Sequence, residues 1–269
     1  MKEYRYPLYN STLITKTFFI KELRKYRKIN VYLPSTYDGV KRFPVIYMFD
    51  SQNLFLHDLS YIKHAWNVEN AIENSIKAKE SEGYIVVGVY TSKDRLNEYA
   101  PCSYLPDLKI KGKIKGEKMM YFYTHELKDY IDKNYLTLSD TKNTFLAGSS
   151  CGGNMSLFGI LEYPNIYGGA GVFSIASSIL SNDFKDYIRD MSLSKVHKIY
   201  YYIGGEEGYT EDNSESEEIL KEAIYVKELL ETKGVEIKYT YDESKKHNEY
   251  TWEEYFPEFI TFISEDRNV

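Results

Sequence analysis

Cysteine, long apolar runs and excess positive charge are all scarce in this chain of 269 residues. Its two cysteines are too few for a disulfide framework and do not stand at the spacing of a metal site. No apolar stretch is long enough to cross a bilayer, and the first residues lack the apolar core of a signal peptide. The formal net charge of −6 argues against a nucleic-acid partner. We therefore expect a cytoplasmic protein without a metal, a nucleic-acid partner or a membrane anchor.

The composition is that of an ordinary globular protein, with 43% hydrophobic and 28% charged residues. The length suits one sizeable α/β domain, and no repeat or linker composition divides the chain. We therefore expect a single domain over residues 1–269. Residues 91–115 form a long polar stretch, and long loops inside compact domains are often functional.

Runs typical of strands alternate with stretches of helical spacing along the chain. Strands are expected at 13–20, 27–33, 43–49, 84–90, 144–147, 168–173, 197–203 and 235–241. Helices are expected at 66–79, 116–134, 151–163, 183–191, 215–233 and 250–265, the last one interrupted near Pro257. This alternation predicts an α/β fold with a mostly parallel central sheet and helices on both faces.

The sequence Gly148-Ser149-Ser150-Cys151-Gly152 joins a short apolar run to an expected helix. It has the G-x-S-x-G pattern of a nucleophile elbow, with Ser150 at its centre. A sharp strand-to-helix turn exposes the serine hydroxyl, and the flanking glycines carry no Cβ that would clash there. Ser150 is the candidate nucleophile, whereas Cys151 lies off the centre of the turn. The alternative is a purely structural turn built from small residues.

The position of a catalytic histidine is restricted by the order of the chain. An α/β hydrolase places its serine, acid and histidine in that order, with the last two in loops after strands. Of the five histidines, His57, His64 and His125 precede the serine, and His197 opens an expected strand at the wrong end. His247 alone follows both the serine and the last expected strand, and is the candidate general base.

A carboxylate is needed to hold the histidine in one tautomer and to stabilise its charged form. It should lie in the loop after the strand expected at 197–203, where Glu206 and Glu207 are adjacent and Asp212 follows. Asp242 and Glu243, beside the histidine's own strand, are weaker candidates. The residues alone leave the choice between the two adjacent glutamates open.

An oxyanion hole needs two backbone N–H donors. One is expected from Cys151, the residue after the nucleophile. The other is expected from the loop after the buried strand at 43–49, and therefore from Ser51 or Gln52.

Five blocks of the sequence form a further pattern, at 44–55, 95–101, 148–153, 204–208 and 247–249, with Trp252 and Pro257 beyond them. Together they resemble the putative esterase family of α/β hydrolases, and the match runs from about Tyr26 to the last helix. That family includes esterase D-like enzymes, enterochelin esterase-like proteins and feruloyl esterase modules. Two departures stand near the expected site, because Ser51 replaces a glycine and Cys151 replaces a methionine of the family pattern.

The resemblance implies Ser150 as nucleophile and His247 as base, and it favours Glu207 over Glu206 as the acid. It implies no cofactor. Within the block at 95–101, Arg95, Glu98 and Tyr99 are expected either to anchor the loop, with Arg95 and Glu98 as an ion pair, or to contact the substrate.

The function expected from the elbow and the resemblance is that of a serine carboxylic-ester hydrolase acting on a small-molecule ester. Acylated sugars, feruloyl esters and siderophore-type esters are the substrate classes implied. An acyltransferase using the same triad, and a non-catalytic binding protein on the same fold, are the two alternatives.

Overall fold

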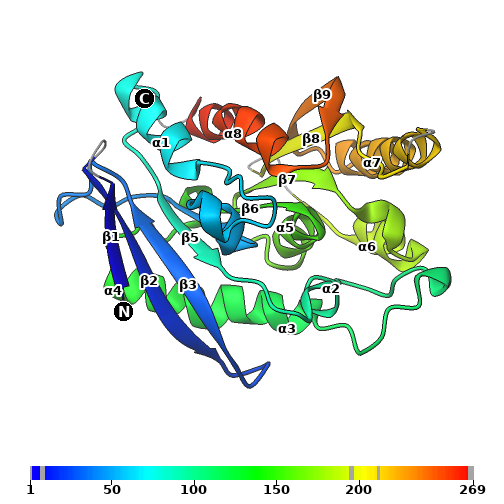
Figure 1. Cartoon of the computed structure of the whole chain (residues 1–269), viewed down its shortest axis with the longest axis horizontal. Helices are drawn as coiled ribbons and strands as arrows, with labels where there is room; N and C mark the ends of the chain where they lie inside the picture. Colours follow the sequence, from blue (N-terminus) through cyan, green and yellow to red (C-terminus); the bar gives the residue numbers. More distant parts are fainter. Residues whose placement is uncertain (1, 7–9, 194–196, 211–212, 266–269) are drawn as a thin grey trace.

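The computed structural model describes residues 2–6, 10–193, 197–210 and 213–265 of the chain (Figure 1). Within these residues, nine strands form one sheet in the order β1-β2-β3-β5-β4-β6-β7-β8-β9. The strands are β1 (Lys2–Tyr6), β2 (Ser11–Ile20), β3 (Lys25–Leu33), β4 (Val45–Met48), β5 (Ile85–Val89), β6 (Thr144–Ser150), β7 (Gly169–Ile175), β8 (Lys198–Glu206) and β9 (Glu236–Lys246). The α-helices are α1 (Val68–Lys77), α2 (Arg95–Glu98), α3 (Gly116–Tyr121), α4 (Lys128–Asn134), α5 (Cys151–Glu162), α6 (Asn182–Asp190), α7 (Ser214–Glu231) and α8 (Glu249–Ser264).

The sheet is mostly parallel. Strands β1, β2, β3 and β5 pair antiparallel in succession, and every pairing from β5 through β4, β6, β7 and β8 to β9 is parallel. The central strands β4 and β5 are buried along their whole length, which is why their sequences are continuous apolar runs. Because parallel strands end at the same edge, the loops after β4, β6, β8 and β9 meet there.

Helices cover both faces of this sheet, as the sequence predicts (Figure 1). One core packs buried side chains of α3, α5, α6 and α7 against the sheet. The other packs α1 and α8, with Trp252, Phe256 and Phe259 among its largest side chains. The expected α/β architecture is therefore confirmed.

The structure differs from the sequence-based expectation in several elements. Strand β1 was not expected, and β9 continues five residues further, to Lys246, than the run at 235–241 suggested. The stretch at 116–134 is helical throughout, with a π-helical segment at Phe122–Leu127 between α3 and α4. The long polar stretch at 91–115 holds the short helix α2 and a 3-10 turn, η3 (Pro106–Leu108).

The expected interruption near Pro257 is wrong, because α8 runs unbroken through that residue. A proline inside a helix costs about 3 kcal/mol through its missing N–H and its ring. Pro257 itself lies on the exposed face, while Phe256, Phe259 and Ile260 beside it are buried in the core. The packing of these side chains offsets the cost of the proline.

Glu69, in the first turn of α1, is a carboxyl group almost removed from water. Its residue is 5% exposed, and within the described part of the chain its Oε2 has no hydrogen-bond partner. Burial, with a smaller contribution from the nearby charge of Glu253, raises the pKa of Glu69 from 4.5 to about 8. The folded protein therefore keeps this carboxyl protonated at pH values where the unfolded chain ionises it.

We expect Glu69→Gln to stabilise the protein at pH 8 and to have little effect at pH 4.5. Between these values the folded state binds more protons than the unfolded state, so the free energy of unfolding falls as pH rises. The neutral amide removes this dependence, and the difference should reach about 2–4 kcal/mol at pH 8. Urea unfolding at both pH values measures this difference. The control is Glu117→Gln, which changes an exposed residue in the first turn of α3. An equal effect at both pH values would show that folding does not raise the pKa of Glu69.

Candidate active site

Strand β6 turns directly into helix α5 at Ser150, the residue at the centre of the G-x-S-x-G pattern. Ser150 has φ 58° and ψ −128°, a backbone conformation that non-glycine residues rarely adopt. A Cβ at Gly148 would lie 2.7 Å from the carbonyl oxygen of Gly152, so strand and helix approach too closely for any side chain there. The sharp strand–turn–helix expected from the sequence is present, and the serine sits on its strained corner.

His247 and Glu207 meet at the same edge of the sheet. His247 follows β9 and Glu207 follows β8, and the two strands are parallel neighbours. The Nδ1 atom of His247 donates a hydrogen bond of 2.5 Å to Oε2 of Glu207, whose side chain is fully buried. A carboxylate accepts this bond, so the histidine carries its proton on Nδ1 and its Nε2 is left as a proton acceptor.

The second carboxylate oxygen of Glu207 is held as well. Its Oε1 accepts hydrogen bonds from the Ser174 hydroxyl and from the backbone N–H of Gly204, both at 2.7 Å. The indole N–H of Trp252 donates to the same Ser174 hydroxyl at 2.9 Å, and the Trp252 ring meets the His247 ring edge to face. Both Ser174 and Trp252 therefore position the histidine–glutamate pair.

Sequence reasoning missed these two supports as site residues. Trp252 was noted only as part of the resemblance, and Ser174 lies in a strand with no motif around it. A serine with a positive φ inside a buried strand is unusual, but backbone angles are not visible in a sequence.

The other acidic candidates lie elsewhere. Glu206 is half exposed and its carboxylate faces Lys246 at 3.6 Å, whereas the side chain of Glu207 is fully buried. Asp242 accepts a hydrogen bond from the Tyr255 hydroxyl at 2.6 Å, and Glu243 is exposed. Asp212 lies outside the described residues.

The residues expected to form an oxyanion hole stand beside the elbow. Ser51 and Gln52 begin the 3-10 turn η1 (Ser51–Asn53) after β4, and β4 pairs in parallel with β6. Cys151 is the first residue of α5, where N–H groups have no partner within the helix. The Ser51 side chain occupies the space over Gly88 of β5, since a Cβ on that glycine would lie 2.4 Å from the Ser51 hydroxyl oxygen.

Cys151 is poorly suited to act as the nucleophile itself. It is only 2% exposed, and its burial raises the pKa of its thiol against the opposing effect of the nearby Arg95 charge. Because the thiolate is the reactive form of cysteine, this environment keeps Cys151 unreactive.

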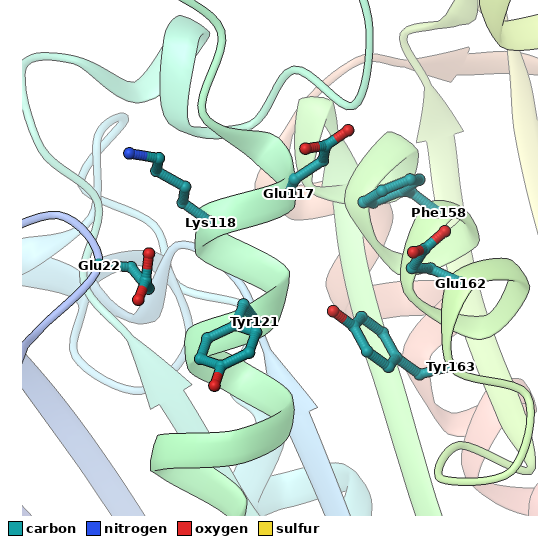
Figure 2. Close-up of a pocket in the computed structure, with 7 residues that line it drawn as sticks. All are labelled: Glu22, Glu117, Lys118, Tyr121, Phe158, Glu162 and Tyr163. Carbon is teal, nitrogen blue, oxygen red and sulfur yellow. The ribbon is translucent and has the colours of Figure 1, made fainter.

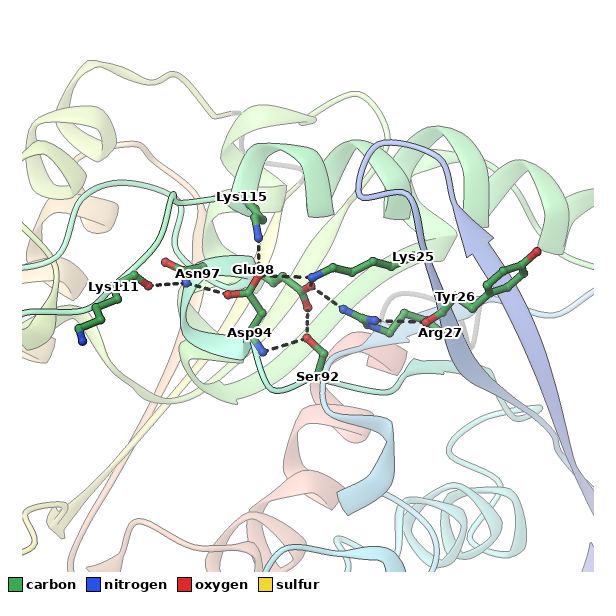
Figure 3. Close-up of polar contacts among 9 residues, drawn as sticks. All are labelled: Lys25, Tyr26, Arg27, Ser92, Asp94, Asn97, Glu98, Lys111 and Lys115. Atoms are coloured by element: carbon green, nitrogen blue, oxygen red, sulfur yellow. Dashed lines mark hydrogen bonds and ion pairs between the residues drawn. The ribbon is translucent and has the colours of Figure 1, made fainter.

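The expected ion pair between Arg95 and Glu98 is wrong, because each has a different partner. The Arg95 guanidinium forms a two-pronged contact with Asp50. Glu98 is fully buried and accepts hydrogen bonds from Arg27 of β3 and from the Ser92 hydroxyl (Figure 3). The long loop is therefore anchored at two points, through Arg95 to Asp50 and through Glu98 to Arg27.

A cavity of about 460 Å3 opens beside His247. Most of its lining is polar, from Glu206, Thr210, Asn213, Lys246 and Asn248, and Tyr209 adds one aromatic ring. That ring is 79% exposed and its centroid lies 6.0 Å from the ring centroid of His247.

A second cleft, of about 440 Å3, lies between α3 and α5 (Figure 2). Its walls are Glu22, Glu117, Lys118, Tyr121, Phe158, Glu162 and Tyr163. None of the expected site residues lines it, so it is separate from the elbow. Among the residues that the structure describes, no group of three or more His, Cys, Asp or Glu side chains could hold a metal ion. No helix within the described ranges is long and apolar enough to cross a membrane.

The mostly parallel sheet, the strand-to-helix turn at Ser150 and the loops gathered at its edge define the α/β-hydrolase class of protein. Within that class the chain belongs to the family described as "Putative esterase", whose sequence profile matches residues 20–263. Membership of this family makes it a carboxylic ester hydrolase.

The chain is also similar to other proteins of known sequence and to solved structures. The chain is 27% identical over 228 residues to "Uncharacterized protein YjcH" of Bacillus subtilis (strain 168), covering 80% of this chain and 86% of that protein. It is 27% identical over 241 residues to "Endo-1,4-beta-xylanase/feruloyl esterase" of Xylanibacter ruminicola, covering 86% of this chain but 30% of that longer protein. An IroE-like serine hydrolase from Shewanella oneidensis has the same fold, with a TM-score of 0.75, 15% identity, and coverage of 96% of this chain and 81% of that one.

Proposed function

We propose that the chain hydrolyses carboxylic esters through a triad of Ser150, His247 and Glu207 and an acyl-enzyme intermediate. The observation that carries the proposal is the hydrogen bond between buried Glu207 and His247, at the sheet edge where the strained turn presents Ser150. A carboxylate at Nδ1 favours the tautomer that a general base requires, and this supports the proposal.

The proposed reaction begins with attack of the Ser150 oxygen on the acyl carbon, while Nε2 of His247 takes the hydroxyl proton. Glu207 stabilises the imidazolium that forms. The negative charge on the carbonyl oxygen is met by the N–H of Cys151 and by that of Ser51 or Gln52. His247 then gives its proton to the leaving alcohol. In the second half of the reaction, water attacks the acyl-enzyme while His247 takes a proton from it. His247 returns that proton to the Ser150 oxygen as the carboxylic acid leaves.

We propose further that the substrate is a small ester with a hydroxylated alcohol, such as an acylated or feruloylated sugar. The support is the cavity beside His247, where polar side chains and the exposed ring of Tyr209 offer hydrogen bonds and one apolar face. The name of the Xylanibacter relative includes a feruloyl esterase.

The test is turnover of p-nitrophenyl acetate, butyrate and octanoate, followed by acetylated and feruloylated sugars and a catecholate siderophore ester. A preference in kcat/KM for the sugar esters supports the substrate class, and a preference for the siderophore ester contradicts it. Adding an alcohol acceptor separates hydrolysis from acyl transfer, since a transferase would divert most of the acyl group to the acceptor. If no ester is turned over, a fluorophosphonate probe decides whether Ser150 is reactive, and absence of labelling would support a binding protein instead.

A further inference from the structure

Asp50 links the strand β4 to the turn that is expected to supply an oxyanion donor. Its backbone is left-handed, with φ 55° and ψ 49°, which is strained for a residue other than glycine. The direction of this one residue determines where the N–H groups of Ser51 and Gln52 point. A change in its conformation would redirect both N–H groups, and the contacts of Asp50 oppose such a change.

Arg95 holds the side chain of Asp50. Its Nε donates to Oδ1 at 2.9 Å and its Nη2 donates to Oδ2 at 2.8 Å, so both carboxylate oxygens are occupied. The guanidinium carbon lies 5.2 Å from the ring centroid of Tyr99, and the Tyr99 hydroxyl accepts the backbone N–H of Asp50 at 3.2 Å. Both the side chain and the backbone of Asp50 are thus fixed from α2 and the residue after it.

The same turn is tied to the loop after β5 at a second point. The Gln52 side-chain oxygen accepts the backbone N–H of Thr91 at 3.1 Å, and its amide nitrogen lies 3.4 Å from Oδ1 of Asp50. Asp50 also lies next to the elbow, because a Cβ built on Gly152 would be 3.6 Å from its Oδ2. The turn, the long loop and the first residues of α5 therefore meet around one carboxylate.

Helix α2 is itself anchored to the antiparallel part of the sheet. Glu98, three residues after Arg95, is fully buried and paired with Arg27 of β3 (Figure 3). Asp94, on the other side of Arg95, is paired with Lys115. Arg95 is thus presented to Asp50 from a short helix that is held on both sides.

From this geometry we infer that Arg95 and Asp50 are positioning residues, whose ion pair sets the oxyanion donors of the β4 loop. The inference rests on the proposed function, since it concerns the oxyanion hole of the same site. A role for Arg95 in binding an anionic group of the substrate is the competing interpretation. Two of its donors and its charge are already matched by Asp50, and this favours the positioning role.

The experiment compares Arg95→Lys, Arg95→Met, Asp50→Asn and the double variant that combines Arg95→Met with Asp50→Asn. The substrate is p-nitrophenyl acetate, which carries no charge. We expect each single change to lower kcat by about 10- to 100-fold with KM changed by less than about threefold, because a displaced donor acts on the transition state. Lysine can pair with one oxygen only, so Arg95→Lys should retain more activity than Arg95→Met. The double variant should be no worse than the worse single variant, because either change already breaks the pair.

A boronic acid provides the readout that a general structural defect would not give. Phenylboronic acid forms a tetrahedral adduct with a reactive serine, and one of its oxygens occupies the oxyanion position. Its inhibition constant should rise by the same factor as kcat falls. The control is Arg189→Met, which breaks the exposed ion pair of Arg189 with Asp186 in α6. It should leave both kcat and the inhibition constant unchanged.

Three results would overturn the inference: an unchanged boronic acid affinity, additive effects in the double variant, or an increase in KM with kcat retained. The last would make Arg95 a substrate-binding residue. Should Arg95→Met unfold, Arg95→Lys and Asp50→Asn carry the same comparison. Failure of the proposed function would be seen separately, as a wild-type protein in which a fluorophosphonate does not label Ser150.

Discussion

Ser150→Ala should reduce kcat for a p-nitrophenyl ester by about five orders of magnitude, as in other enzymes that lose a catalytic serine. Alanine removes the attacking oxygen and leaves nothing for His247 to deprotonate. The backbone N–H groups and the buried His247–Glu207 bond do not involve the Ser150 hydroxyl, so the protein should still bind the ester. KM should therefore change much less than kcat.

The matched control is the serine one position earlier. Ser149 is buried in β6, one residue before the strained corner on which Ser150 sits. Ser149→Ala should keep turnover within about threefold of wild type, because it leaves the attacking oxygen of Ser150, the His247–Glu207 bond and the backbone N–H groups in place. Mass spectrometry after fluorophosphonate treatment should find one adduct, on Ser150, in wild type and in Ser149→Ala. Turnover that survives Ser150→Ala would contradict the nucleophile assignment.

The elbow could be predicted from the sequence because it is local. Gly148 and Ser150 lie within three residues, and the close approach that excludes a Cβ at Gly148 arises within the same turn. His247 could be chosen as the candidate base without knowing any contact. Only this one of the five histidines follows both Ser150 and the last expected strand. Such arguments need only the alternation of strands and helices, which apolar periodicity reveals.

Other features depend on contacts between distant parts of the chain, and no local pattern encodes them. Arg95 pairs with Asp50, 45 residues away, although Glu98 is the nearer acidic residue in sequence. Glu98 is instead drawn to Arg27, 71 residues away. Propensity alone cannot rank these partners, because the sheet order decides which strand lies beside α2.

The unbroken helix at Pro257 has the same kind of cause. The local rule places a break there, but the buried aromatic side chains on the opposite face of α8 keep the helix intact. The sequence around Ser174 shows only that it lies in a buried strand. Its role depends on hydrogen bonds to Trp252 of α8 and to Glu207 of the loop after β8. Sequence patterns therefore predicted the candidate nucleophile and base, whereas the contacts around them required the tertiary structure.

Glu207→Gln has the second-largest expected effect on kcat. The reason lies in the hydrogen bonds to Oε1, the carboxylate oxygen that does not face His247. Ser174 and the Gly204 N–H both donate to Oε1, so a glutamine would place its carbonyl oxygen there. Its NH2 group would then face Nδ1 of His247 and donate to it. That bond selects the tautomer with the proton on Nε2, the atom that must accept the proton of Ser150.

We therefore expect Glu207→Gln to lower kcat by about three to four orders of magnitude with the fold and KM retained, as when a triad acid is replaced by its amide. The matched control is Glu206→Gln, one residue away, whose side chain is half exposed and faces Lys246. It should retain turnover of p-nitrophenyl acetate within about twofold, since exposed ion pairs contribute little and this ester has no hydroxylated alcohol for the cavity lined by Glu206 to bind. Steady-state kinetics on p-nitrophenyl acetate measures both variants, and melting temperatures confirm that both are folded. If Glu206→Gln lost activity and Glu207→Gln kept it, the carboxylate acting on His247 would be the exposed one. The buried network of Glu207, Ser174 and Trp252 would then be a structural feature of the core rather than part of the catalytic machinery.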